Sequence, residues 1–236
     1  MTFQVNYVTT QLSEDVATIS CNSFTTSPLS FPLEDTTKHV DKDNIYTECP
    51  VWNHKAQRTF LVRSPIDFTM QYDRETDRVE WNHNLNNDNF FFFDNGWNNK
   101  SPVVQTTFPS VIMWTKQRNI WVEARPHAYT SGRNNIVAIG GWWNLSQWVR
   151  TINFAFQFAD ETQPITIKRG DPLYEICLYN QHNLNDKVKL TRHDTIPDAI
   201  ARRANANVRV KQFVKRLSPD HLFQSQSKCP FAFLKR

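Results

Sequence analysis

Four residues in two short segments have the types best suited to ligand binding. Arg125 and His127 lie in ARPHAY, and Trp142 and Asn144 lie in GGWWN. Arginine and histidine can hold polar or anionic groups, an indole can stack on a base or a sugar, and an amide can both donate and accept hydrogen bonds. One interpretation is therefore a nucleotide or sugar site near these residues.

Further tryptophans could extend such a site into an aromatic platform: Trp121, Trp143 and Trp148. Packing in the core or in an interface explains buried tryptophans more simply, and we prefer that interpretation for this group.

A second pattern suggests metal chemistry. His39 and Asp41 enclose Val40 in the His-x-Asp arrangement of iron- and 2-oxoglutarate-dependent oxygenases, with His127 or His182 as a third ligand. The flanking sequence TTKHVDKDN is strongly polar and lacks apolar alternation, so we expect a solvated loop there and no metal site.

Composition excludes several classes. With 5 glycines, the last of them Gly170, the chain has no glycine-rich phosphate cradle. The net charge of +4 fits solubility as well as an anionic partner. The 4 cysteines are widely spaced, without a C-x-x-C pair, so we expect free thiols rather than zinc or a disulfide framework. We expect no cofactor.

The sequence shows no targeting signal. MTFQVNYVTT lacks the basic start and apolar run of a signal peptide, and no stretch approaches the ~20 apolar residues of a membrane span. We therefore expect no membrane association, and a protein that is made in a reducing compartment.

Period-two alternation of apolar and polar residues dominates the chain and predicts strands. The segments are FQVNYV, TFLVRS, DFTMQY, RVEWN, VIMWT, IWVEARP, INFAFQFA, ITIKRG and LYEICLY. We predict a mainly β fold, an antiparallel β-sandwich or jelly-roll-like body over residues 1–190. Residues 82–99, Asn-rich around a run of Phe, are predicted to form a loop.

Residues 191–236 are predicted to form a C-terminal α-helix and a tail, packed on the body or on a neighbouring subunit. Thr195 and Pro197 are typical of a helix start, and an apolar stripe follows at Val210, Phe213, Val214 and Leu217. Basic residues flank this stripe, but they are explained as well by solvation, so support for a nucleic-acid partner is weak.

The stretch ITIKRGDPLYEICLYN contains an Arg-Gly-Asp sequence, which we interpret as a turn leading into a strand. Gly170 permits a tight backbone and Asp171 can accept hydrogen bonds from local amides. Leu173 and Ile176 then point toward the core. We set cell adhesion aside.

The order of segments from IVAIGGWWN to ITIKRGDPLYEI resembles the core of the deoxyuridine triphosphatase superfamily. There a Gly-x-x-Asp turn carries the catalytic carboxylate, and the resemblance places Gly141 to Asn144 at that turn. Asn144 cannot act as the general base because its amide is neutral. The Arg-Ser motif and the glycine-rich lid of the superfamily are also absent.

A wider resemblance covers residues of about 45 to 190. The segments ECPVWNHKAQRTFLVRSPIDF, EARPHAY, GGWWN and RGDPLYEICL are similar to a family of uncharacterised proteins found chiefly in tailed phages. This similarity implies a phage origin. Because the catalytic carboxylate and the lid are also missing, we expect a non-enzymatic phage protein, a virion component or an accessory factor, that binds a phage or host protein in the virion or in the host cytoplasm. The deoxyuridine triphosphatase resemblance further implies a homo-oligomer. The alternative is a nucleotide- or sugar-binding protein or hydrolase near Arg125, His127, Trp142 and Asn144.

Overall fold

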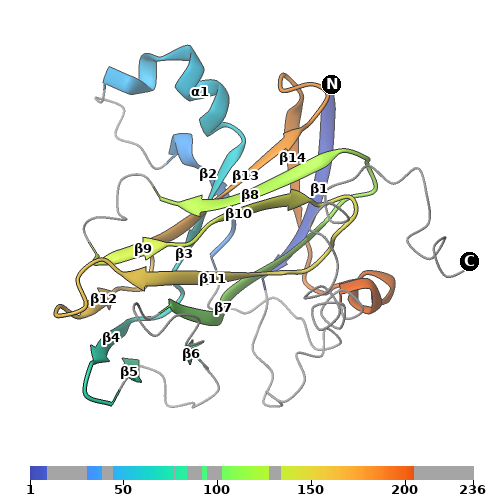
Figure 1. The fold of residues 1–236 in the computed structure, drawn as a ribbon. Coiled ribbons are helices and arrows are strands. Elements are labelled where there is room, and N and C mark those ends of the chain that lie inside the picture. Colours follow the sequence, from blue (N-terminus) through green and yellow to red (C-terminus); the bar gives the residue numbers. More distant parts are fainter. Residues whose placement is uncertain are drawn as a thin grey trace, which may run out of the picture.

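The computed structural model describes residues 1–9, 31–38, 45–76, 78–83, 92–94, 103–127 and 134–204. Within these residues the chain is built from strands with a few short helices, arranged as two facing sheets and a small third sheet (Figure 1). The predicted mainly β, sandwich-like fold is confirmed.

The first sheet has the strand order β14-β1-β7-β11-β9, with β6 paired to β7. Its strands are β1 (Thr2–Thr9), β6 (Phe92–Asp94), β7 (Val103–Trp114), β9 (Ile136–Ala138), β11 (Thr151–Phe158) and β14 (Lys187–Arg192). All its pairings are antiparallel except that β1 and β14 run parallel, from Thr2 opposite Lys187 to Tyr7 opposite Arg192.

The second sheet has the order β10-β8-β13-β3-β2 and is antiparallel throughout. Its strands are β2 (Glu34–Asp35), β3 (Thr59–Arg63), β8 (Ile120–Pro126), β10 (Gly141–Asn144) and β13 (Pro172–Asn180). A small sheet, β12-β4-β5, consists of β4 (Phe68–Asp73), β5 (Arg78–His83) and β12 (Ile165–Ile167).

Helices are short in the described part of the chain. They are the 3-10 helices Thr36–Lys38 and Ile45–Glu48, the α-helix α1 (Pro50–Ala56), and a helical segment at residues 198–204. None of these described helices has the length and apolar character needed to span a bilayer.

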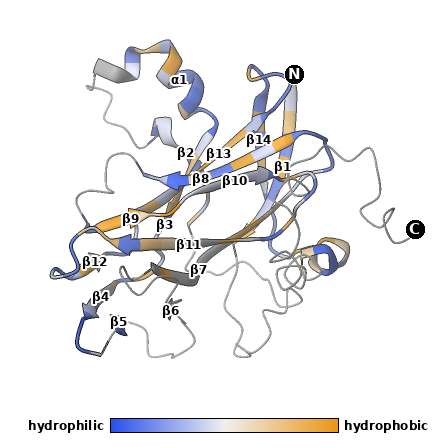
Figure 2. Cartoon of the chain, viewed as in Figure 1, coloured by the Kyte–Doolittle hydropathy of each residue, from blue (hydrophilic) through white to orange (hydrophobic). Residues whose placement is uncertain are grey.

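One continuous core fills the space between the sheets. Every second side chain of these strands belongs to this core, for example Ile120 and Val122 in β8 and Tyr174, Ile176 and Leu178 in β13, while the residues between them face the other side of the sheet. Figure 2 shows hydrophobic residues recurring along the strands of both sheets. In β11, Ile152, Phe156 and Phe158 are buried as predicted, although a bulge shifts the register between residues 152 and 154.

A second apolar cluster fixes residues 198–204 to the outside of the first sheet. Ile196, Ala201 and Ala204 are buried against Val8 and Trp114, together with Ile112, Val149 and the half-buried Ile200. A helix thus begins where Thr195 and Pro197 predicted it and packs on the body. The predicted apolar stripe at 210–217 and the tail lie outside the described residues.

The Arg-Gly-Asp sequence forms the predicted turn ahead of β13. Gly170 has a φ of 93°, a left-handed conformation that glycine adopts without a Cβ penalty. The Lys168 backbone N–H donates to Asp171 Oδ2 at 2.8 Å, and Arg63 Nη1 donates to the Gly170 carbonyl at 2.6 Å. Leu173 and Ile176 are buried, so this prediction is confirmed in each part.

Two local predictions are wrong. Residues 141–144 are a strand, β10, and the turn comes after them, where the Gln147 and Trp148 amides donate to the Asn144 carbonyl. Within the predicted loop 82–99, Phe92–Asp94 pair with β7 as the strand β6. Both strands are too short for alternation to reveal them. The His39–Asp41 segment lies outside the described residues.

Candidate functional site

The polar and aromatic residues best suited to bind a ligand lie on the outer face of the second sheet. Residues directly opposite in an antiparallel ladder share one face. Glu123 lies opposite Trp142 on one side and Cys177 on the other, and Arg125 lies opposite Glu175. We call this surface the Trp142 face: Trp121, Glu123, Arg125, Trp142, Glu175, Cys177 and Tyr179.

A buried ion pair holds the centre of the Trp142 face. Arg125 Nε donates to Glu175 Oε2 at 2.8 Å, Nη2 lies 2.7 Å from the same oxygen, and Nη2 also donates to Thr59 Oγ1 at 3.3 Å. Glu175 is 3% exposed, and this burial raises the pKa of its carboxyl although the Arg125 charge lowers it. The pair therefore fixes the Arg125 guanidinium in one orientation.

His127 and Cys177 border this ion pair. His127 Nε2 lies 3.8 Å from Glu175 Oε1, and the imidazole is buried. Cys177 is a buried free thiol whose pKa is raised, chiefly by its burial. A thiol with a raised pKa is protonated at neutral pH, so Cys177 is suited to packing rather than to nucleophilic attack.

Aromatic residues form the part of the Trp142 face nearest solvent. Trp142 is 56% exposed, and its ring centroid lies 4.9 Å from that of Trp121 at an interplanar angle of 40°. Trp121 is itself held by a hydrogen bond from its Nε1 to Gln181 Oε1 at 2.9 Å. Tyr179 and Glu123 are half-buried beside them. Trp121 therefore packs against one side of the Trp142 ring and leaves much of the rest accessible.

Asn144 is on the same side of β10 as Trp142, but its side chain is buried at the end of the strand. It is 1% exposed, and its Oδ1 accepts the Ser146 backbone N–H at 3.0 Å. Its amide therefore stabilises the turn that follows β10. In the ladder it lies opposite Trp121, while Arg125 lies at the far end of β8.

Of the four sequence-predicted ligand residues, the structure leaves the side chains of Arg125 and Trp142 accessible and buries those of His127 and Asn144. Sequence reasoning missed Glu175 and Glu123. A lone carboxylate within the apolar run LYEICLY requires a partner when the strand is buried, and Arg125 is the arginine of the similar strand IWVEARP. The carboxylate in one apolar strand and the arginine in the other could have predicted this ion pair.

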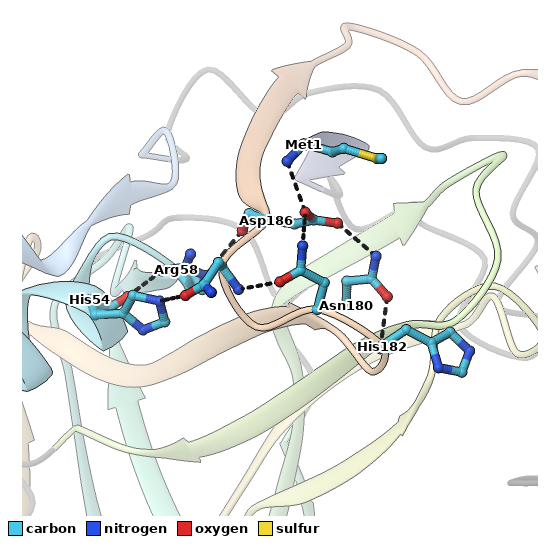
Figure 3. Close-up of polar contacts among 8 residues, drawn as sticks. Met1, His54, Arg58, Asn180, His182 and Asp186 are labelled. Atoms are coloured by element: carbon cyan, nitrogen blue, oxygen red, sulfur yellow. Dashed lines mark hydrogen bonds and ion pairs between the residues drawn. The ribbon is translucent and has the colours of Figure 1, made fainter.

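A second polar cluster lies where the start of β1 meets the turn between β13 and β14 (Figure 3). The Met1 amino group lies 3.0 Å from Asp186 Oδ1, and Asn180 and Asn183 each donate to this carboxylate at 2.8 Å. The buried Arg58 donates from Nε to the Asp186 carbonyl at 3.1 Å. These bonds lower the pKa of Asp186, the Met1 amino group contributing most, and they join α1, β1 and β13.

A shallow open pocket of about 490 Å³ lies near β9 and β12, lined in part by Asn135, Asp160 and Gln163. The Asn135 side chain donates to the carbonyls of Asp160 and Gln163 and accepts from the Asp160 amide. The amide that could face a ligand therefore stabilises the local turns instead.

The three histidines weighed as metal ligands do not form a described group. His127 follows β8 and His182 follows β13, at opposite ends of two paired antiparallel strands. Among the described residues, no three His, Cys, Asp or Glu side chains gather as a metal site.

Comparison with known proteins adds no family to this description. No protein-family model matches the chain, and no curated protein matches it.

Proposed function

We propose that this chain is a non-enzymatic phage protein, a virion component or an accessory factor, that acts by binding a protein partner. The phage origin rests on the similarity of ECPVWNHKAQRTFLVRSPIDF, GGWWN and RGDPLYEICL to a tailed-phage family. The binding role rests on one feature of the structure, the edge of the first sheet at β9.

β9 is the last strand of its sheet, and within the described residues it has a ladder partner on the β11 side alone. Val137 is 38% exposed and the adjoining Ile139 is 44% exposed. Natural edge strands are commonly protected by charge, proline or a covering segment, because an apolar edge pairs readily with another chain. The exposed side chains of residues 136–139 are instead β-branched and apolar.

An extended segment of a partner protein suits this edge. Addition of a strand supplies main-chain hydrogen bonds to β9, and side chains of the added strand can cover Val137 and Ile139. A second copy of the chain could provide that strand, which would give a homo-oligomer. Another phage or host protein could add a strand to this edge in the same way.

The test is a comparison of tagged full-length proteins purified from infected cells, with bound proteins quantified by mass spectrometry. The edge variant Val137→Lys/Ile139→Lys places two charges on the strand, which blocks pairing. A variant at another exposed residue, Trp81→Lys in β5, is the matched control.

We expect one phage or host protein, or a second copy of the chain, to accompany the wild type and the Trp81→Lys variant in a fixed ratio. The edge variant should lose it while keeping the wild-type circular-dichroism spectrum. The absence of any protein in fixed ratio with the wild type would contradict the proposed function.

A further inference from the structure

The Trp142 face has one ring positioned for stacking. Trp142 is 56% exposed, and its contact with Trp121 at 4.9 Å fixes the orientation of the indole. A fixed and accessible ring gains stacking energy from a ligand without losing much side-chain entropy on binding. Gly141, the preceding residue, leaves open space, since a Cβ built there would meet no atom within 4 Å.

A hydrogen-bond acceptor and a hydrogen-bond donor both lie beside this ring. Glu123 is directly opposite Trp142 in the ladder, and such pairs have their Cβ atoms about 5 Å apart. Arg125 lies on the same face two residues along β8, held in place by Glu175, and its side chain is 21% exposed. A ligand stacked on Trp142 can therefore donate hydrogen bonds to a carboxylate and accept them from a fixed guanidinium.

The charges of this surface balance. The cations Lys55 and Arg125 and the carboxylate of Glu123 all lie close enough to Glu175 to act on its charge. Two cations thus face two carboxylates, and Arg125 is already paired with one of them at 2.7 Å. A phosphate-bearing ligand needs an excess of positive charge, which this surface lacks.

We infer that the Trp142 face binds a neutral saccharide, with one sugar ring stacked on Trp142 and its hydroxyl groups bonded to Glu123 and Arg125. Sugar hydroxyls donate and accept in equal measure, which suits a carboxylate beside a guanidinium, and the C–H face of the ring suits an indole. This inference goes beyond the proposed protein partner, since it concerns the opposite sheet and a different class of ligand.

The sequence predicted an alternative ligand site at Arg125, His127, Trp142 and Asn144. The structure changes which residues belong to this site. Trp142 and Arg125 remain, and Glu123 joins them. His127 is buried beside Glu175, and Asn144 stabilises a turn, so neither contributes a contact to the proposed ligand.

The test is calorimetric titration of the full-length protein with four neutral hexasaccharides, built from glucose, mannose, galactose or N-acetylglucosamine. We expect at least one to bind with a Kd below about 5 mM, as a single stacked ring with a few hydrogen bonds allows. Trp142→Ala should weaken that binding about tenfold or more, and Trp142→Phe should restore part of it.

Two further variants separate this site from a general loss of structure. Glu123→Gln keeps the shape of the side chain and should weaken binding severalfold. Trp81→Ala removes the 37% exposed tryptophan of β5, in a different sheet, and should bind as the wild type does. Thermal unfolding of each variant confirms that the comparison is between folded proteins.

Three outcomes overturn the inference. They are failure of all four hexasaccharides to bind, wild-type binding by Trp142→Ala, and preferential binding of a nucleoside triphosphate or of an oligothymidylate at Trp142. None of these outcomes bears on the β9 edge, so the proposed function stands or falls by its own experiment.

Discussion

At the scale of single residues, the Arg125–Glu175 pair decides how the Trp142 face is built. Glu175 is almost fully buried, and Arg125 contributes two of its nitrogen atoms to one carboxylate oxygen. Removal of one partner from a buried pair leaves the other charge uncompensated. Replacement of both by apolar residues removes the desolvation cost together with the attraction.

We predict that Arg125→Ala and Glu175→Ala each lower the free energy of unfolding by about 3 kcal/mol. The double variant Arg125→Met/Glu175→Leu should regain most of that loss, because no unpaired charge remains in it. Urea denaturation of the four proteins measures this. Single variants within about 0.5 kcal/mol of the wild type would show that the pair has no structural role.

The raised pKa of Glu175 gives this pair a defined pH dependence. A folded-state pKa above the unfolded one means that the folded protein holds the proton more tightly. The corresponding stability is present below the unfolded pKa, about 4.3, and is lost as the pH rises through the folded value. Glu175→Gln should lack this loss.

Unfolding measured at pH 4 and at pH 7 tests the sign. The stability of the wild type relative to Glu175→Gln should be lower at pH 7 than at pH 4. A relative stability that increases from pH 4 to pH 7 would mean that attraction to Arg125 outweighs burial.

Asp186 should show the opposite dependence, because its pKa is lowered, first by the Met1 amino group and then by Asn180. Its contribution is present above the ordinary aspartate pKa of about 3.9 and is lost as the pH falls through the folded value. We predict that Asp186→Asn is less stable than the wild type at pH 7 and that the difference shrinks by pH 2.5. A difference independent of pH would exclude the ion pair as its cause.

At the scale of elements, the crossing from β9 to β10 connects the two sheets through Gly140. A Cβ at this position would lie 2.3 Å from the Ala124 carbonyl oxygen and 3.1 Å from the Arg125 Cα, both backbone atoms. The clash cannot be relieved by a side-chain rotation, so β10 would have to move away from β8. That ladder positions Trp142 opposite Glu123.

We predict that Gly140→Ala lowers the free energy of unfolding by about 3 kcal/mol, at the upper end of the cost of overpacking. The neighbouring Gly141→Ala is the control, because its added Cβ would meet no atom within 4 Å. Thermal unfolding of both variants compares them. Equal stability of the two would contradict the close approach of β8 and Gly140.

Sequence patterns predicted β8, β11 and β13 well, and for a clear physical reason, whereas the longest strand, β7, was predicted only over VIMWT at its end. IWVEARP and LYEICLY alternate because one side packs in the core and the other faces outward, and β8 and β13 follow them closely. β10 has only four residues with two adjacent tryptophans, so alternation does not reveal it, and the superfamily resemblance placed a turn there instead. β14 was missed because only two apolar residues, Val188 and Leu190, alternate in it, and both pack on the core only in part.

At the scale of the whole molecule, the candidate site depends on contacts that no local pattern contains. Arg125 and Glu175 are fifty residues apart and meet because β8 and β13 pair across the sheet. Arg125, His127 and Trp142 could be selected by residue type alone. The burial of Asn144 and its hydrogen bond to the Ser146 amide depend on how the sheet and the following turn pack, which residue type does not reveal.

The two proposed surfaces lie on different parts of the sandwich. The β9 edge belongs to the first sheet, and the Trp142 face covers the outside of the second (Figure 1). Gly140 joins them along the chain.

Photo-crosslinking from position 137 in infected cells tests the central claim, partner binding at the β9 edge, most directly. A benzophenone amino acid replaces Val137 in β9, and the same group at Glu75, exposed in the turn between β4 and β5, is the control. We predict a crosslink from position 137 to one phage or host protein or to a second copy of the chain, and none from position 75. Equal labelling from both positions, or no crosslink from position 137, would contradict the claim.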